Sequence, residues 1–89
     1  MDVTDNNARQ RFELEINGHV AFADYRREGD ILHLPHVEAH PALRGTGAAG
    51  QLMQGIMHIA MREKLRVHPI CGYAVVWLEK HKEFSDLVI

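Results

Sequence analysis

The chain has 89 residues, of which 46% are hydrophobic and 25% are charged, and its formal net charge is −2. These values fit one soluble globular domain and give no bulk reason to expect nucleic acid or a membrane surface as a partner. A single cysteine excludes an intramolecular disulfide and favours a reducing, cytoplasmic setting. The polar start of the chain carries no signal-peptide pattern, and the longest apolar run is too short to cross a bilayer. A domain this small would gain from dimerisation, so a monomer and a homodimer are both compatible with it.

The first residues are polar, and we expect residues 1–9 to form a flexible tail ahead of a domain at 10–89. Apolar and charged residues then alternate over 11–16, which predicts a half-buried strand. Asn17 and Gly18 follow directly and predict a tight hairpin, since both central positions of such a turn need positive φ.

The strand that returns from this hairpin is expected over 19–27, and Gly29 lies in the next turn. A third strand is expected over 31–39, in which Pro35 indicates an edge position or a bulge. Because short turns join the three strands, they should be antiparallel neighbours.

The hydrophobic period changes after Pro41. Apolar residues recur with helical spacing over 47–64, and a short strand is expected at 66–70. Residues 73–84 keep a spacing that favours a helix, although two adjacent valines within them favour a strand. The resulting order is β-β-β-α-β-α, an α+β domain with a mostly antiparallel sheet and one strand added after a crossover helix.

Three glycines at the start of the expected long helix, Gly45, Gly47 and Gly50, spell G-x-G-x-x-G. A dinucleotide-binding fold would need a strand before the turn, a parallel sheet and an acidic residue that ends the next strand. Here a hairpin meander precedes the glycines, and no acidic residue ends 66–70. A phosphate loop of the Walker type is excluded because no Gly-Lys-Ser/Thr follows. A glycine-rich helix start without any ligand stays open.

The stretch Leu-Arg-Gly-Thr-Gly-Ala-Ala-Gly at 43–50 resembles the acyl-CoA diphosphate loop of the GNAT acyltransferase superfamily, whose variant pattern is Arg-Gly-x-Gly-x-Gly/Ala. Such a loop works because glycines let a diphosphate approach the backbone and the helix start favours negative charge. The resemblance implies CoA-binding residues at Arg44, Gly45, Thr46, Gly47, Ala48 and Ala49.

The resemblance covers nearly the whole chain beyond residue 10. Over this length the chain is similar to a small GNAT-like subfamily whose members have about the same number of residues. It implies a minimal GNAT-like fold with a V-shaped acyl-CoA cleft, acetyl-CoA or CoA as acyl donor, and transfer to an unidentified amine, which a protein could carry. The shared positions are His36 and Glu38, the Arg-Gly-x-Gly loop, Pro69 and Cys71, and Lys80-His81.

His36 and Glu38 are two residues apart on the third expected strand, so their side chains share a face. The resemblance places this strand end beside the acyl thioester, where Glu38 could take a proton from an attacking amine and His36 could assist. A solvated strand face is the alternative. His33, His36 and His40 cluster in the sequence without a recognised zinc spacing, so no metal is expected.

Two departures from the wider superfamily concern catalysis. The Asn17-Gly18 turn closes the gap where ordinary members insert two helices that shape the acceptor site. The superfamily tyrosine that protonates the leaving thiolate corresponds to Leu78, which cannot donate a proton. Cys71 is therefore a candidate for the acid or for a transient acyl acceptor, and a small buried structural cysteine is the alternative. The rival to an enzyme is a non-catalytic CoA-binding or protein-interaction module.

Overall fold

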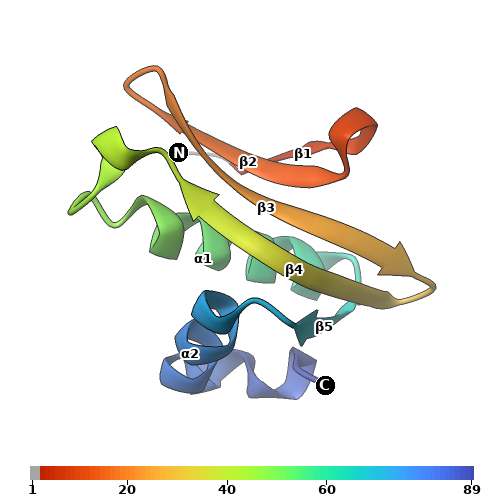
Figure 1. The fold of residues 1–89 in the computed structure, drawn as a ribbon. Coiled ribbons are helices and arrows are strands. Elements are labelled where there is room, and N and C mark those ends of the chain that lie inside the picture. Colours follow the sequence, from red (N-terminus) through yellow and green to blue (C-terminus); the bar gives the residue numbers. More distant parts are fainter. Residues whose placement is uncertain (1–2) are drawn as a thin grey trace.

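The structure is a computed structural model that describes residues 3–89, and it contains one sheet with helices packed against it (Figure 1). In chain order the elements are β1 (Thr4–Asn6), β2 (Arg11–Ile16), β3 (His19–Glu28), β4 (Ile31–Ala39), α1 (Ala48–Arg62), β5 (Arg66–Pro69) and α2 (Gly72–Lys80). The five strands lie side by side in the order β1-β2-β3-β4-β5. The first four are antiparallel neighbours, and β5 runs parallel to β4 after the crossover through α1. The α+β architecture expected from the sequence is confirmed.

The expected flexible tail at residues 1–9 is largely ordered, since residues 4–9 form a strand and a short 3-10 turn. Thr4–Asn6 form β1, which pairs with β2 in the register Thr4↔Glu13, and a short 3-10 turn follows. The hydroxyl of Tyr25 on β3 also donates to Asp5 Oδ1 at 2.6 Å. Sequence pattern could not reveal this strand, because Asp5 and Asn6 have low strand propensity and only partners distant in sequence hold it. Residues 1 and 2 of the expected tail lie outside the described residues.

The hairpin between β2 and β3 is formed as the sequence predicts. Asn17 and Gly18 have φ values of 52° and 81°, and Ile16 pairs with His19 across the turn. These dihedral angles belong to the tight turn that matches the twist of the flanking strands. The hairpin is therefore closed directly, with no helix inserted between β2 and β3.

Pro35 lies at an irregularity of β4. Asp24 of β3 pairs with His36, whereas Arg26 pairs with His33, so β4 advances by one residue more than β3 between these pairs. This is the bulge that the proline indicated. The strand β5 pairs with β4 only from Ile31 to Leu34, and beyond the bulge β4 continues without it.

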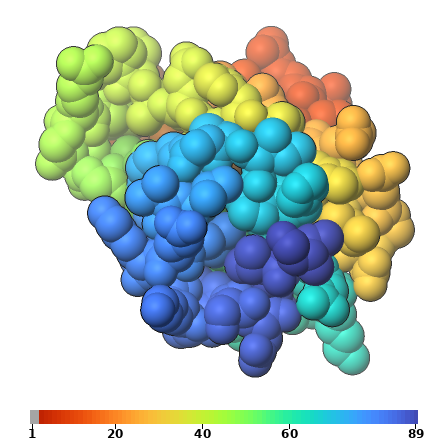
Figure 2. Space-filling view, turned by 60° about the horizontal axis from the view of Figure 1, so that its bottom comes forward, coloured from red at the N-terminus to blue at the C-terminus, as the bar shows by residue number. Residues whose placement is uncertain are grey.

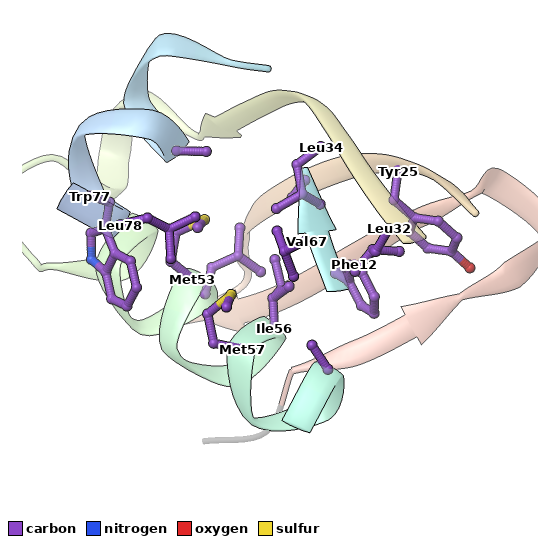
Figure 3. Packing of buried hydrophobic residues seen from close by; sticks show 14 of the residues in the cluster. Phe12, Tyr25, Leu32, Leu34, Met53, Ile56, Met57, Val67, Trp77 and Leu78 are labelled. Atoms are coloured by element: carbon purple, nitrogen blue, oxygen red, sulfur yellow. The ribbon is translucent and has the colours of Figure 1, made fainter. Parts of the chain in front are cut away.

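One core fills the space between the sheet and the helices (Figure 3). The helix α1 covers one face of the sheet, and α2 packs against α1 beside β5. None of the helices in residues 3–89 is both long and apolar enough to span a membrane. The largest fully buried side chains come from the sheet and from α1 and are Phe12, Leu14, Leu32, Leu34, Leu52, Met53, Ile56, Met57 and Val67.

Both helices lie where the hydrophobic period predicts them, with one difference in length. The first helix ends close to Lys64, which adopts a left-handed φ of 59°. The second ends at Lys80 rather than at residue 84, because His81 leaves helical geometry with φ −122° and a 3-10 turn (Lys82–Leu87) follows. Phe84 in that turn is buried, so its apolar spacing extended the expected helix too far.

Candidate functional site

The strands β4 and β5 separate after Leu34, and α2 begins at the point of separation (Figure 1). The carbonyl oxygen of Leu34 accepts hydrogen bonds from the N–H groups of Ile70 and Cys71, at 3.1 and 3.0 Å. The chain then turns away from β4 into the helix. Cys71 therefore lies at the vertex of a V-shaped opening between the two strands.

The opening leaves one edge of β4 without a partner strand. On the other edge, the N–H of His40, just after β4, donates to the carbonyl oxygen of Val20 on β3 at 3.1 Å. Successive backbone groups of a strand point to opposite edges, so the N–H and C=O groups of Val37 and Ala39 point away from β3. No described strand pairs with them there. Backbone donors and acceptors therefore line the opening and are available to an amide-bearing ligand.

The loop between β4 and α1 contains conformations that suit glycine. Gly45 has φ 78°, and Gly47, the N-cap of α1, has φ 77°. The Oγ1 of Thr46 donates to the carbonyl oxygen of Leu43 at 2.5 Å and accepts from the N–H of Ala48 at 3.2 Å. The threonine hydroxyl thus fixes the loop against the first turn of the helix.

The start of α1 has the properties of an anion site. The N–H groups of Ala49 and Gly50 make no hydrogen bond within residues 3–89, and the helix dipole adds partial positive charge there. A Cβ atom at Gly45 or Gly47 would meet no atom within 4 Å, so the loop presents an open backbone surface. Arg44 is exposed and forms no ion pair in the described part of the chain.

The anion site and the vertex of the opening lie on one side of the molecule. Figure 2 shows the start of α2, in light blue, next to the yellow-green connection that leads from β4 into α1. Trp77 and Tyr73 of α2 approach Gly50 of α1, at 3.4 and 3.9 Å from the place of a Cβ atom there. A ligand that reaches from the loop to Cys71 would therefore follow the free edge of β4.

Cys71 is a free, half-buried cysteine at the N-cap position of α2, and it packs against the hydrophobic core. His36 and Glu38 project from the opposite face of β4, where both are exposed and His36 Nε2 lies 2.9 Å from Glu38 Oε1. The structure therefore brings His36 and Glu38 together, and no hydrogen bond in residues 3–89 joins either of them to Cys71.

One polar residue near the opening, Tyr73, was not among the candidate site residues that the sequence suggested. Leu78, at the position of the usual tyrosine acid, is buried in the core and only 6% exposed. Tyr73 lies on another side of α2, and its hydroxyl points toward the first turn of α1 near Gly50. Partial burial raises the pKa of Tyr73, which keeps the hydroxyl protonated. Its position two residues after Cys71 was the available signal, but the direction of its side chain depends on how α2 packs.

The histidines that cluster in the sequence enter separate contacts. His33 Nδ1 lies 2.8 Å from His68 Nδ1, and His33 Nε2 lies 2.6 Å from Glu28 Oε1. His40 stacks on His19 with ring centroids 4.3 Å apart. Within residues 3–89 no group of three His, Cys, Asp or Glu side chains is arranged to hold a metal ion.

A mainly antiparallel sheet that opens beside a glycine-rich helix start is incompatible with a doubly wound dinucleotide-binding domain. The sequence model of the GCN5-related N-acetyl-transferase family matches residues 11–87, and the chain belongs to this family.

A solved structure supports the same fold. The solution NMR structure of a GCN5-like candidate N-acetyltransferase from Staphylococcus aureus superimposes with a TM-score of 0.76 at 20% sequence identity, and the match covers 99% of this chain and 87% of the other. No curated protein matches the sequence.

Proposed function

We propose that this protein transfers the acetyl group of acetyl-CoA to an amine. The observation that carries the proposal is the arrangement of a glycine loop, a free strand edge and a thiol along one opening. The loop offers unpaired N–H groups at a helix start, β4 offers the backbone groups of Val37 and Ala39, and Cys71 lies at the vertex. This order matches the order of diphosphate, amide-bearing arm and thioester along acetyl-CoA.

The residues present fit the donor. Arg44 and the N–H groups of Ala49 and Gly50 would hold the diphosphate, because charge-assisted hydrogen bonds at a helix start favour phosphate. The open backbone at Gly45 and Gly47 allows its oxygens to approach closely. Acetyl-CoA supplies the activated acetyl group, and a backbone N–H of β4 beyond the bulge would polarise the thioester carbonyl.

The chemistry needs one group that removes a proton and one that supplies a proton. The acceptor ammonium must lose a proton before its nitrogen forms a bond to the acetyl carbon, and Glu38, hydrogen-bonded to His36, would accept it directly or through water. The carbon–sulfur bond then breaks, and the departing thiolate takes up a proton. Cys71 and Tyr73 are the candidates for the proton donor, since the side chain of Leu78 has no proton to donate. Cys71 could alternatively carry the acetyl group for a short time.

A second candidate function is CoA binding without turnover. The observation that favours it is the buried Leu78 together with the direct β2–β3 hairpin, which removes both the usual acid and the usual acceptor-binding helices. Both functions require the same donor site. They differ in whether acetyl-CoA releases its thiol when an amine is present.

The first experiment tests the donor site. CoA and acetyl-CoA should each raise the melting temperature, and a concentration of 100 times the dissociation constant should contribute about 2.7 kcal/mol. NAD is the control and should leave the melting temperature unchanged. Stabilisation by NAD and not by CoA would contradict the proposal.

The second experiment separates the two functions. Thiol release from acetyl-CoA is followed with a panel of amines for the wild type, Glu38→Gln, Tyr73→Phe and Cys71→Ser. Loss of a general base costs about two to four orders of magnitude, so Glu38→Gln should be slowed at least a hundredfold. CoA binding without thiol release from any amine would favour the non-catalytic module.

A further inference from the structure

The outer face of the sheet, which is turned away from α1, carries a group of residues that the donor site does not use. On β3 the buried residues Ala21 and Ala23 face the core, so Val20, Phe22 and Asp24 lie on the outer face. This face is open, because α1 and α2 both pack on the core side or at the β5 edge (Figure 1).

Phe22 lies in the middle of this outer face with acidic residues around it. The register sets it directly opposite Glu13 on β2 and Glu38 on β4. Residues opposite each other on neighbouring strands have Cβ atoms about 5 Å apart, so the ring lies between two carboxylates. Glu15 and Asp24 occupy the next outward positions, which gives the face four carboxylates.

A cation of the chain itself already occupies part of this face. The guanidinium carbon of Arg11 lies 4.5 Å from the centroid of the Phe22 ring, and its Nε lies 2.5 Å from Glu13 Oε2. The hydrogen bond from Arg11 lowers the pKa of Glu13, so this carboxylate stays charged. The ring and carboxylate therefore bind one cation in the folded chain, which identifies the chemistry that suits this face.

Space for a ligand remains beside Arg11. A hollow of about 390 Å³ opens between the β2–β3 hairpin and the end of β4. Phe22 and Glu38 both line it, and the carboxylate of Glu38 forms a hydrogen bond only with His36 in the described chain. The full lining is Arg11, Gly18, His19, Val20, Phe22, Glu38, His40 and Pro41.

We propose that this hollow binds the acyl acceptor and that the acceptor is a primary alkylammonium on a slender methylene chain. The aromatic face of Phe22 and the carboxylate of Glu38 recognise the cation. The assignment of this ligand as an acceptor rests on the proposed function, since Glu38 is the group that would remove its proton. Arg11 covers the ring in the free protein and moves aside when the amine binds.

Titration of cadaverine into the isotope-labelled, CoA-free protein tests the site by NMR. The backbone signals of Phe22 and Glu38 should shift in a saturable manner, and the neutral diol of the same chain length should leave them unchanged. Replacing an exposed cation–π partner costs about two- to fivefold in affinity, so Phe22→Leu should weaken binding by that factor. Glu38→Gln should weaken it at least as much, whereas Glu83→Gln, an exposed carboxylate on the distant 3-10 turn, should have no effect.

Arg11→Gln is the decisive variant. It uncovers Phe22 and frees the carboxylate of Glu13, so cadaverine should bind several-fold more tightly. The proposal is overturned if cadaverine does not shift the Phe22 and Glu38 signals, if the diol shifts them equally, or if Arg11→Gln weakens binding in a protein whose spectrum stays folded. A CoA titration of the same sample separates the two proposals: failure of CoA to shift the Gly45–Gly50 signals counts against the donor site alone.

Discussion

The position of Cys71 is determined by its backbone. Its N–H shares the carbonyl oxygen of Leu34 with Ile70, which holds the residue where β4 and β5 separate. The sequence predicts this placement, because Pro69 ends a strand just before a helix. It could not predict that Cys71 packs toward the core while Glu38 projects from the outer face, since this depends on the bulge at Pro35 and on the packing of α2.

We expect iodoacetamide to label Cys71 in the folded protein, and saturating CoA to slow the labelling, because the thiol is half-buried at the vertex of the opening. Mass spectrometry of the labelled peptide measures the rate. Cys71→Ser should keep the fold and CoA binding. An acetyl group found on Cys71 after incubation with acetyl-CoA would identify it as an acyl acceptor. Labelling only after unfolding would show that Cys71 is a structural core residue.

Two substitutions at the loop residue Gly47 separate the effect of backbone strain on stability from the effect of a side chain on CoA binding. Its φ of 77° is costly for a β-branched residue, so Gly47→Val should lower the free energy of unfolding by about 1–2 kcal/mol. Asparagine tolerates this conformation, and the space around the glycine is open, so Gly47→Asn should stay close to wild-type stability. Both variants should lose CoA affinity, because a side chain lies where the diphosphate approaches. Unchanged CoA affinity in Gly47→Asn, measured by calorimetry, would remove the loop from the site.

At the scale of elements, alternation and helical spacing predict β2, β3, β4, α1 and β5 to within about two residues, because each buries one face. The hydrophobic pattern does not predict the strand β1. It carries no apolar alternation, and it is held by the pairing with β2 and by the bond from Tyr25 to Asp5. The opening between β4 and β5 is likewise a tertiary feature. Pro35 predicts the bulge in β4 but does not predict that β5 separates from β4 there.

The contact between Tyr25 and Asp5 should give a measurable pH dependence. A hydrogen bond to a charged group contributes about 1.5–3 kcal/mol, so Tyr25→Phe should lower the free energy of unfolding by that amount at neutral pH. Burial, together with the bond to Asp5, raises the pKa of Tyr25 from 10.0 to about 12. A raised folded-state pKa means that this contribution is complete below pH 10 and is lost as the pH rises toward 12.

Urea denaturation of the wild type and Tyr25→Phe across this pH range measures the effect. The difference between the two proteins should shrink between pH 10 and 12. Tyr73→Phe is the matched control, because Tyr73 is 42% exposed and burial alone raises its pKa, so it should cost less at neutral pH. A difference between wild type and Tyr25→Phe that stays constant up to pH 12 would mean that folding does not raise the pKa of Tyr25.

At the scale of the whole molecule, the acidic outer face is the property that the sequence alone could not provide. Only the sheet register shows that Glu13, Phe22 and Glu38 form one row. The family resemblance predicted the donor half because its residues are contiguous in sequence. The outer face is assembled from three strands, so no local sequence motif predicts it.

The N-terminal segment also packs on α1. A Cβ atom at Gly55 of α1 would overlap Cγ2 of Val3 and lie 2.8 Å from its Cβ. Glycine within a helix is about 1 kcal/mol less favourable than alanine. The contact with Val3 explains why glycine occupies position 55, because no space is left for a side chain there. Packing of Val3 on α1 thus anchors the chain just before β1.

A double-mutant cycle tests this anchor. Gly55→Ala should lower the free energy of unfolding, because the methyl group displaces Val3 and loosens β1. In the background of Val3→Gly the space is free, and the same substitution should raise the free energy of unfolding by up to about 1 kcal/mol through helix propensity. The opposite signs arise from direct contact, since independent sites would give equal effects in both backgrounds. Urea denaturation of the four proteins measures the cycle, and a stabilising effect of Gly55→Ala in the wild-type background would show that Val3 does not lie against α1.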